Sequence, residues 1–167
     1  MSNKHFIPKG FEVPKSLETN KVKIRMLKVS DVVKDYDAVM SSIGHLQRTK
    51  PFGPNQKWPK GLTLEQNLID LGWHHKEFQM GSTFAYTVMT PNEAKCLGCL
   101  YIEPSTKMGY DAEVYMWVRQ SEVQTGLDAY LFDTVQEWID SKWPFNSVAY
   151  PGREIAWNEW QKLVPKE

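Results

Sequence analysis

The chain is predicted to fold as one α/β (α+β) domain around a mixed central sheet. Segments of alternating apolar residues, typical of strands, and segments of helical spacing follow one another in the order β-α-α-β-β-β-α-β-α. Three successive strands joined by short turns predict an antiparallel arrangement, and the strand, helix and strand that follow predict a parallel crossover. The length of 167 residues suits a single domain with one substantial core.

The first half is expected to contain an extended arm, one strand and two helices. Pro8, Gly10 and Pro14 disfavour regular structure in the arm. Thr63-Leu-Glu-Gln66 forms a capping box that opens the second helix. The expected segments are the arm over residues 1–20, the domain over 21–167, a strand over 21–27, a helix over 32–43, an irregular loop over 45–61 and a helix from residue 63.

The second half is expected to supply the rest of the sheet and two more helices. A Pro-Asn-Glu-Ala turn at residues 91–94 joins the first two strands as a hairpin, and Pro104 and Gly109 mark the next turn. The expected segments are strands over residues 82–90, 95–102, 112–119 and 147–150, and helices over about 127–139 and 154–163.

The balance of acidic and basic residues argues against nucleic acid or a membrane surface as a partner. Twenty basic and twenty acidic residues give a formal charge of zero, so the broad positive field that attracts nucleic acid or anionic lipid is absent. No apolar run is long enough to span a bilayer, and residues 1–20 lack the apolar core of a signal peptide. We therefore expect a cytoplasmic protein with no nucleic-acid or membrane partner. Two cysteines do not make a disulfide framework, which agrees with a reducing compartment.

No metal site is predicted. Cys96-x-x-Cys99 has a spacing found in zinc sites, but it falls within a strand, where residues three apart point to opposite faces, and no second pair completes the ligands. Two packed thiols are expected instead. His74 and His75 are adjacent on a helix and cannot converge on one ion.

The order of elements, together with Leu97-Gly-Cys-Leu-Tyr-Ile102 and Ala112-Glu-Val-Tyr-Met-Trp-Val-Arg119, resembles the GNAT family of acyl-CoA-dependent N-acyltransferases over about residues 22–163. The resemblance implies the GNAT fold and acetyl-CoA or another acyl-CoA as co-substrate. It also implies direct attack on the thioester by the amine of a small-molecule or peptide acceptor.

In that family the central strand separates from its parallel neighbour, and main-chain groups in the gap hold the pantetheine arm and the thioester carbonyl. The resemblance assigns this role to Met116, Trp117, Val118 and Arg119. Attack by an amine also needs a base, and Glu113 is the candidate. Alternatively, Glu113 is a cross-strand partner on the polar face of the sheet.

The family's pyrophosphate loop aligns with residues 123–128, where only Gly126 matches the family pattern. Asp128 stands where Gly or Ala is expected and would repel phosphate. Thr125 and Asp128 can instead close a capping box. The residues assigned to the coenzyme in this loop are Gln124, Thr125, Gly126 and Leu127.

The family's final helix carries a tyrosine that protonates the departing thiolate, and this chain has Trp160 there. Because indole is no useful acid, the role is expected to be either vacant or taken by another group such as Tyr150 or water. The chain ends soon after Leu163, without the family's last strand pair. We expect either a more open cleft or a cleft that the arm or a second subunit, in a homodimer, covers.

The acceptor is expected to contact residues from the loop after the first helix and from the central strand. These candidates are His45, Phe52, Trp58 and Tyr115. Two other functions stay open at this point. One is a non-catalytic GNAT-fold protein that binds a ligand or partner, which Asp128 and Trp160 favour; the other is an acyl-CoA lyase on the same scaffold.

Overall fold

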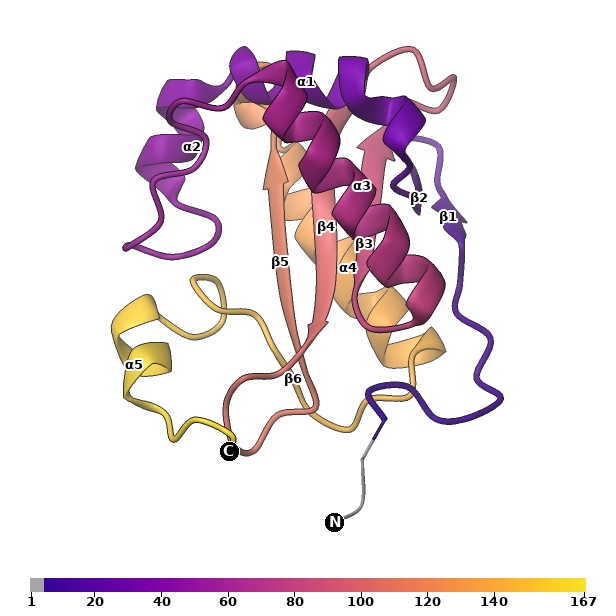
Figure 1. The fold of residues 1–167 in the computed structure, drawn as a ribbon, viewed down its shortest axis with the longest axis vertical. Helices are drawn as coiled ribbons and strands as arrows, with labels where there is room; N and C mark the ends of the chain where they lie inside the picture. Colours follow the sequence, from indigo (N-terminus) through magenta and orange to yellow (C-terminus); the bar gives the residue numbers. More distant parts are fainter. Residues whose placement is uncertain (1–4) are drawn as a thin grey trace.

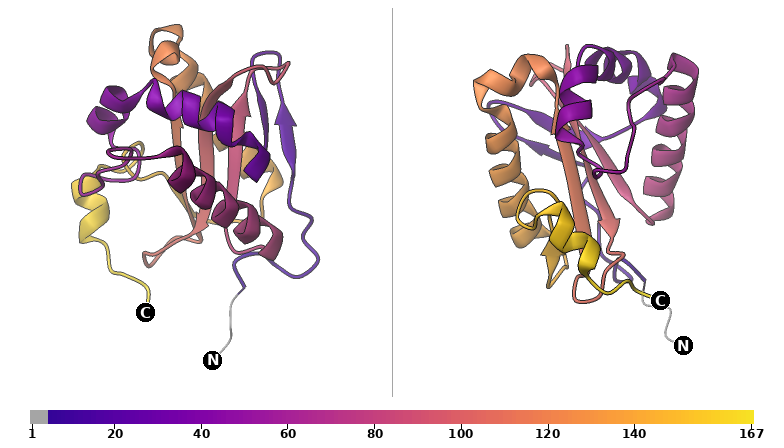
Figure 2. Two further views of the ribbon diagram at one scale, coloured as in Figure 1. Left: turned by 45° about the horizontal axis from the view of Figure 1, so that its top comes forward. Right: turned by 90° about the vertical axis from the view of Figure 1, so that its left-hand side faces the viewer.

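The computed structural model describes residues 5–167. A six-stranded sheet lies between two layers of helix, with α1 and α3 on one face and α4 on the other (Figure 1, Figure 2). The strands are β1 (Ser16–Glu18), β2 (Lys23–Met26), β3 (Phe84–Met89), β4 (Cys96–Pro104), β5 (Ala112–Val118) and β6 (Val148–Ala149). The α-helices are α1 (Val32–Met40), α2 (Ile43–Thr49), α3 (Leu64–Met80), α4 (Leu127–Lys142) and α5 (Trp157–Lys162). Short 3-10 turns, η1 (Val29–Asp31) and η2 (Gln120–Thr125), precede α1 and α4.

The strands lie side by side in chain order, β1 through β6. Every pair is antiparallel except β5 and β6, which are parallel and connected through α4. The predicted antiparallel strands and parallel crossover are therefore confirmed. The Thr63 cap is confirmed as well, since its hydroxyl accepts a hydrogen bond from the Gln66 amide at 3.1 Å.

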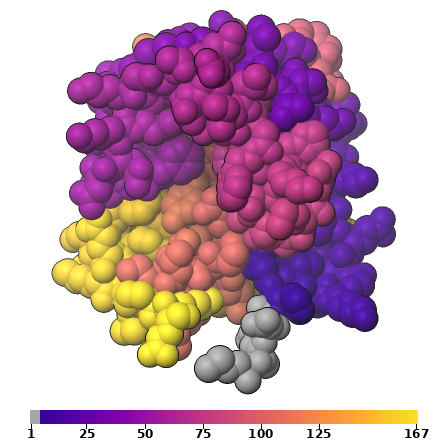
Figure 3. All heavy atoms as spheres, viewed as in Figure 1, coloured from indigo at the N-terminus to yellow at the C-terminus, as the bar shows by residue number. Residues whose placement is uncertain are grey.

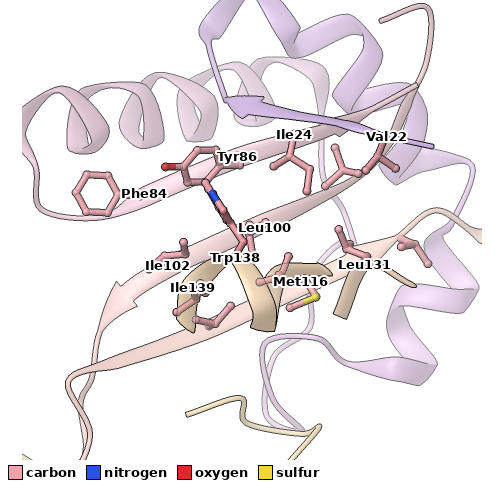
Figure 4. Close-up of a cluster of buried hydrophobic side chains, with 14 of the residues drawn as sticks. Val22, Ile24, Phe84, Tyr86, Leu100, Ile102, Met116, Leu131, Trp138 and Ile139 are labelled. Carbon is pink, nitrogen blue, oxygen red and sulfur yellow. The ribbon is translucent and has the colours of Figure 1, made fainter. Parts of the chain in front are cut away.

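Alternation along the strands divides the apolar residues between two cores. Met116 faces α4 and packs with Leu131 and Ile139, whereas Trp117, its neighbour on β5, faces α1 and α3. Figure 4 shows the α4 side, where the helix lies over the inward residues of β2, β3, β4 and β5. The two cores hold β5 from both faces and fix the strand that borders the candidate site.

The arm is more ordered than its prolines and glycine predict. Leu17 pairs with Ile24, so residues 16–18 form the edge strand β1, and the Tyr86 hydroxyl donates to the Pro14 carbonyl. The Phe6 ring stacks on the Phe84 ring, with 5.9 Å between their centroids. The expectation of an arm without regular structure is thus wrong for residues 16–18, while residues 1–4 lie outside the described part.

The expected loop over residues 45–61 begins with a helix. The first helix ends at Met40, and α2 continues to Thr49 before Lys50 adopts a left-handed conformation, with φ of 48°. The Ser42 hydroxyl donates to the Ala38 carbonyl at 2.7 Å, which fixes the break between the two helices. At the other end of the chain, the last helix starts at Trp157 rather than at residue 154.

A β-bulge corrects the expected placement of the cysteines. Val88 pairs with Gly98 but Met89 pairs with Cys96, so Leu97 is an extra residue in β4. The bulge shifts the alternation by one, and Cys96 and Cys99 lie in the same core instead of on opposite faces. Both are buried free thiols, as expected.

Among residues 5–167, no helix combines the length and apolarity needed to cross a membrane. The same range contains no group of three or more histidine, cysteine or acidic side chains arranged to hold a metal ion.

Candidate active site

The main feature of the site is a gap between β5 and β6. The two strands pair only at Ala112 with Val148 and at Glu113 with Ala149, and β5 continues to Val118 without a neighbour on that side. The Arg119 amide donates to Leu97 on β4, so alternation turns the main-chain groups of Met116 and Val118 toward the gap. Of these groups, the Met116 and Val118 amides have no strand partner among residues 5–167 and are available to a ligand.

A cavity of about 390 Å³ opens beside the unpaired part of β5. Its walls come from β5, from α2 and the turn after it, from the start of α4 and from the segment that leads into α5. In Figure 3, the salmon-coloured part of the chain lies between the purple α2 region and the yellow C-terminal segment. Its lining residues include Tyr115, Met116, Val118, Asp128, Arg153 and Trp157.

Aromatic stacking fixes the wall formed by α5. The Trp157 indole lies parallel to the Tyr115 ring, with 6.1 Å between centroids and an interplanar angle of 6°. Gly152 has φ of 81°, and a Cβ there would lie 2.4 Å from the Trp157 Nε1 atom. A glycine at this position lets the turn after β6 pass close to the indole.

Arg153 spans the gap. Its guanidinium donates to both carboxylate oxygens of Asp128, at 2.9 Å each, and to the Met116 carbonyl at 3.1 Å. It also lies over the Phe132 ring, 5.4 Å from the centroid. The carboxylate that the sequence places at the phosphate loop is therefore paired with a cation inside the cleft.

The expected capping box at the start of α4 is wrong. Gly126, with φ of 78°, precedes the helix and makes no side-chain cap. The Thr125 hydroxyl instead donates to the Glu122 carbonyl at 2.8 Å, and Asp128 is engaged by Arg153. Consequently no side chain of the described residues caps the first amides of α4.

A second, more polar cavity of about 520 Å³ adjoins the first, and both are lined by His45 and Val123. Arg48, Arg119 and Gln124 also line it. The Arg119 guanidinium is buried, pairs with Asp37 at 3.3 Å and donates to the Cys96 carbonyl at 3.0 Å, so its charge is largely compensated. Arg48 is exposed and forms no ion pair among residues 5–167.

Glu113 lies on the α3 side of the sheet and is buried. Its carboxylate accepts a hydrogen bond from the Thr106 hydroxyl at 3.3 Å. Burial raises the pKa of Glu113, while contacts with the Tyr115 and Thr106 hydroxyls oppose the rise. Glu113 does not line the cavity beside β5, but Tyr115, which does line it, contacts Glu113 from the same face.

Tyr150 is placed elsewhere. Its ring packs in the core on the α4 side, edge-on to Phe132 at 5.3 Å, and its hydroxyl is buried without a hydrogen-bond partner among residues 5–167. It does not line the cavity. The structure therefore does not bring Tyr150 and Glu113 together, because they belong to opposite faces of the sheet. Trp160 is also buried, against Tyr110.

Phe52 and Trp58 form an aromatic wall on the α3 side of β5. Phe52 lies 5.1 Å from Tyr101 and 6.1 Å from Tyr115, and Trp58 lies 5.7 Å from Trp117, as measured between centroids. On the far side of this wall, a third cavity of about 400 Å³ lies between the wall, α1, α3 and β4. Of the four predicted acceptor residues, Phe52 and Trp58 line this cavity, whereas His45 and Tyr115 line the cavity beside β5.

Sequence reasoning missed three residues that shape these cavities. Arg153 and Trp157 belong to no motif assigned to the site, and nothing in their spacing predicts that they reach β5. Glu103 lies directly opposite Glu113 on β4 and lines the third cavity. The register between the two strands, which would have revealed this pair, is set by the turn between β4 and β5 and cannot be read from the alternation of either strand alone.

No protein-family model and no curated protein matches the chain. Among solved structures, it is similar to the ribosomal-protein-S5-alanine acetyltransferase of Vibrio fischeri, with a TM-score of 0.59 and 20% identity over 77% of this chain and 67% of that one. It is similar to RimL, the ribosomal L7/L12 alpha-N-protein acetyltransferase, in complex with coenzyme A. The TM-score is 0.56, and the identity is 18% over 75% of this chain and 66% of that one. It is also similar to the microcin C7 self-immunity acetyltransferase MccE in complex with acetyl-CoA and AMP. The TM-score is 0.55, and the identity is 13% over 77% of this chain and 69% of that one.

Proposed function

Because the chain has the fold of the GNAT acetyltransferases, we propose that it is an acyl-CoA-dependent N-acetyltransferase that transfers the acyl group to an amine. The observation that carries the proposal is the gap beside β5. Main-chain groups of Met116 and Val118 border a cavity there and lack a strand partner. A pantetheine arm, which carries amides of its own, can pair with such groups as an added strand would.

The chemistry needs three contributions from the chain. Main-chain donors near Val118 stabilise the negative charge that develops on the thioester oxygen. Glu113 accepts the proton that the amine loses as its nitrogen bonds to the carbonyl carbon, with Tyr115 as the hydroxyl between the cleft and the carboxylate. The carbon–sulfur bond then breaks, and the thiolate takes a proton from water or from Tyr115, which lines the cavity where Tyr150 does not.

The phosphates of the coenzyme are assigned to the polar cavity. Gln124 and the main chain of η2 border it, and Arg48 supplies a positive charge that no acidic residue of the described part pairs. The amides at the start of α4 carry no side-chain cap, and they favour an anion through the helix dipole. Arg153, which already neutralises Asp128, lines the adjoining cavity beside β5.

The acceptor is proposed to be a small-molecule or peptide amine. Two of the similar structures are, by name, acetyltransferases of ribosomal proteins, and a third confers immunity to a microcin. Both kinds of acceptor would present an amine to the thioester in the cavity beside β5.

Two measurements on the purified full chain test the proposal. Calorimetric titrations with acetyl-CoA, free CoA and longer acyl-CoAs should show saturable binding, and at a hundredfold excess over Kd the ligand should stabilise the fold by about 2.7 kcal/mol. Thiol release should then depend on an added amine. Consumption of acyl-CoA without any amine would point to an acyl-CoA lyase, and binding without turnover to a ligand-binding protein. Absence of binding by all of them would contradict the proposal.

A further inference from the structure

We propose that the cavity between the Phe52–Trp58 wall, α1, α3 and β4 is the acceptor pocket and that it selects a cationic amine with an aromatic or apolar portion. The inference rests on the proposed function and specifies its substrate class. The juxtaposition that carries it is an aromatic chamber of about 400 Å³ whose charged lining residues are acidic.

The walls suit an aromatic or apolar group. Phe52 meets both Trp58 and Tyr101 edge-on, at 5.1 Å between centroids, and all three rings line the cavity. Trp73, on α3, also lines the cavity and is 66% exposed, which is high for a tryptophan. Such rings bind organic cations through their π-faces as well as apolar groups.

The polar lining is one-sided in charge. Asp35, Asp70 and Glu103 contribute carboxylates, and the lining contains no lysine or arginine. His74 also lines the cavity, but burial lowers its pKa, so it adds no positive charge at neutral pH. An anionic acceptor would therefore meet repulsion on entry, and a cation would meet attraction.

Glu103 is the carboxylate available to a ligand. Asp35 accepts hydrogen bonds from Asn67 at 2.9 Å and from the Cys99 thiol at 3.3 Å, and Asp70 accepts one from Gln66 at 2.9 Å. The Glu103 carboxylate forms no hydrogen bond or ion pair with residues 5–167. Burial, followed by the charges of Glu113 and Glu77, raises its pKa to about 7. An ammonium group at Glu103 would supply the missing partner and relieve this repulsion.

The chamber lies next to the proposed reaction site. The same wall residues contact both sides, since Phe52 packs against Tyr115 and Trp58 against Trp117, and both partners line the cavity beside β5. Glu103 lies opposite Glu113 in the register of β4 and β5. Glu103 is thus one cross-strand position from the proposed base. The bound ammonium first gives one proton to Glu103, and the neutral nitrogen then attacks the thioester carbon while its second proton passes to Glu113.

The test uses 2-phenylethylamine and its uncharged counterpart 2-phenylethanol as probes of the full chain without acyl-CoA. At about pH 8, Glu103 is ionised and the amine is still protonated. We expect the amine to bind at least about tenfold more tightly than the alcohol by calorimetry, a preference of roughly 1.4 kcal/mol. The Glu103→Gln variant should remove this preference, and Glu65→Gln, on the exposed start of α3, should keep it.

Equal binding of amine and alcohol, binding of neither, or a preference that survives Glu103→Gln would overturn the inference. If that variant does not fold, Trp58→Ala provides the second test, because loss of the wall should weaken both probes together. Acetyl-CoA is titrated separately into the same proteins. Coenzyme binding with no amine preference would reject the acceptor pocket alone, whereas absent coenzyme binding would reject the proposed function.

Discussion

The Arg153 guanidinium donates a hydrogen bond to the Met116 carbonyl, at 3.1 Å, across the gap where β5 and β6 separate. The same guanidinium holds Asp128. One side chain therefore satisfies a main-chain group that a coenzyme arm would use and compensates the carboxylate that would repel its phosphates. We infer that coenzyme binding draws Arg153 away from Met116 and toward the phosphates.

Arg153→Ala should weaken coenzyme A binding by about tenfold, because Asp128 is left uncompensated beside the phosphates. Asp128→Ala should tighten binding several-fold, and the double variant should lie near the parent. Calorimetric titrations at low salt, where screening is least, measure all four proteins. Equal affinities across the four would show that the phosphates do not approach this pair. Stability should change by only about 0–1 kcal/mol, since both side chains are partly exposed.

Glu113→Gln should lower amine acetylation by roughly a hundredfold or more and leave acetyl-CoA affinity unchanged, since it removes the proposed base and no coenzyme contact. A base must be ionised to act. Because burial raises the pKa of Glu113, the parent's kcat/KM should rise with pH through a value above the usual glutamate range. A pH–rate profile of the parent and the variant checks both points; a variant with the parent's turnover would remove Glu113 from the mechanism.

Glu103→Gln should stabilise the protein at high pH. The folded-state pKa of about 7 lies above the ordinary value of 4.5, so the stability that Glu103 contributes is complete below pH 4.5 and is lost as pH rises through 7. The glutamine variant keeps this stability at high pH because its side chain does not ionise. In urea unfolding, the unfolding free energy of the variant should exceed that of the parent by an amount that grows to roughly 1–3 kcal/mol between these pH values. The exposed Glu137→Gln serves as control, and a pH-independent difference would contradict the assignment.

Gly98→Ala should destabilise the fold by roughly 2–4 kcal/mol. A Cβ at Gly98 would lie 2.0 Å from the Trp117 carbonyl oxygen and 3.1 Å from the Val118 Cα, and main-chain atoms cannot move aside without separating β4 from β5. Gly72→Ala, inside α3, is the matched control, because its Cβ would meet only a Val29 methyl group at 3.7 Å. That substitution should be neutral or stabilising. Similar unfolding free energies for the two variants would show that the strands are not held this closely.

The periodic parts of the fold were predictable. Strands β2 to β6 and helices α1, α3 and α4 carry clear apolar patterns, and their order determined the topology. Short elements were not predictable, since three residues of β1 become a strand only through pairing with β2. The bulge at Leu97 was not predictable either. It shows only in the pairing of β4 with β3, where Val88 pairs with Gly98 and Met89 pairs with Cys96.

The candidate site was less predictable than the fold. The gap beside Met116 and Val118 follows from the order of elements, but Tyr150 was chosen for its hydroxyl, and its ring turns to the α4 core. The contact between Arg153 and Asp128 joins residues 25 positions apart through the turn after β6. No local pattern encodes such a contact.

The central claim is that the gap beside β5 binds acyl-CoA, and amide hydrogen exchange tests it most directly. Saturating acetyl-CoA should slow exchange at Met116 and Val118, whose amides face the gap, while Trp117 and the β3–β4 ladder, which are already paired, should change little. If acetyl-CoA binds and the Met116 and Val118 amides exchange as fast as in the free protein, the coenzyme lies elsewhere and the claim is wrong.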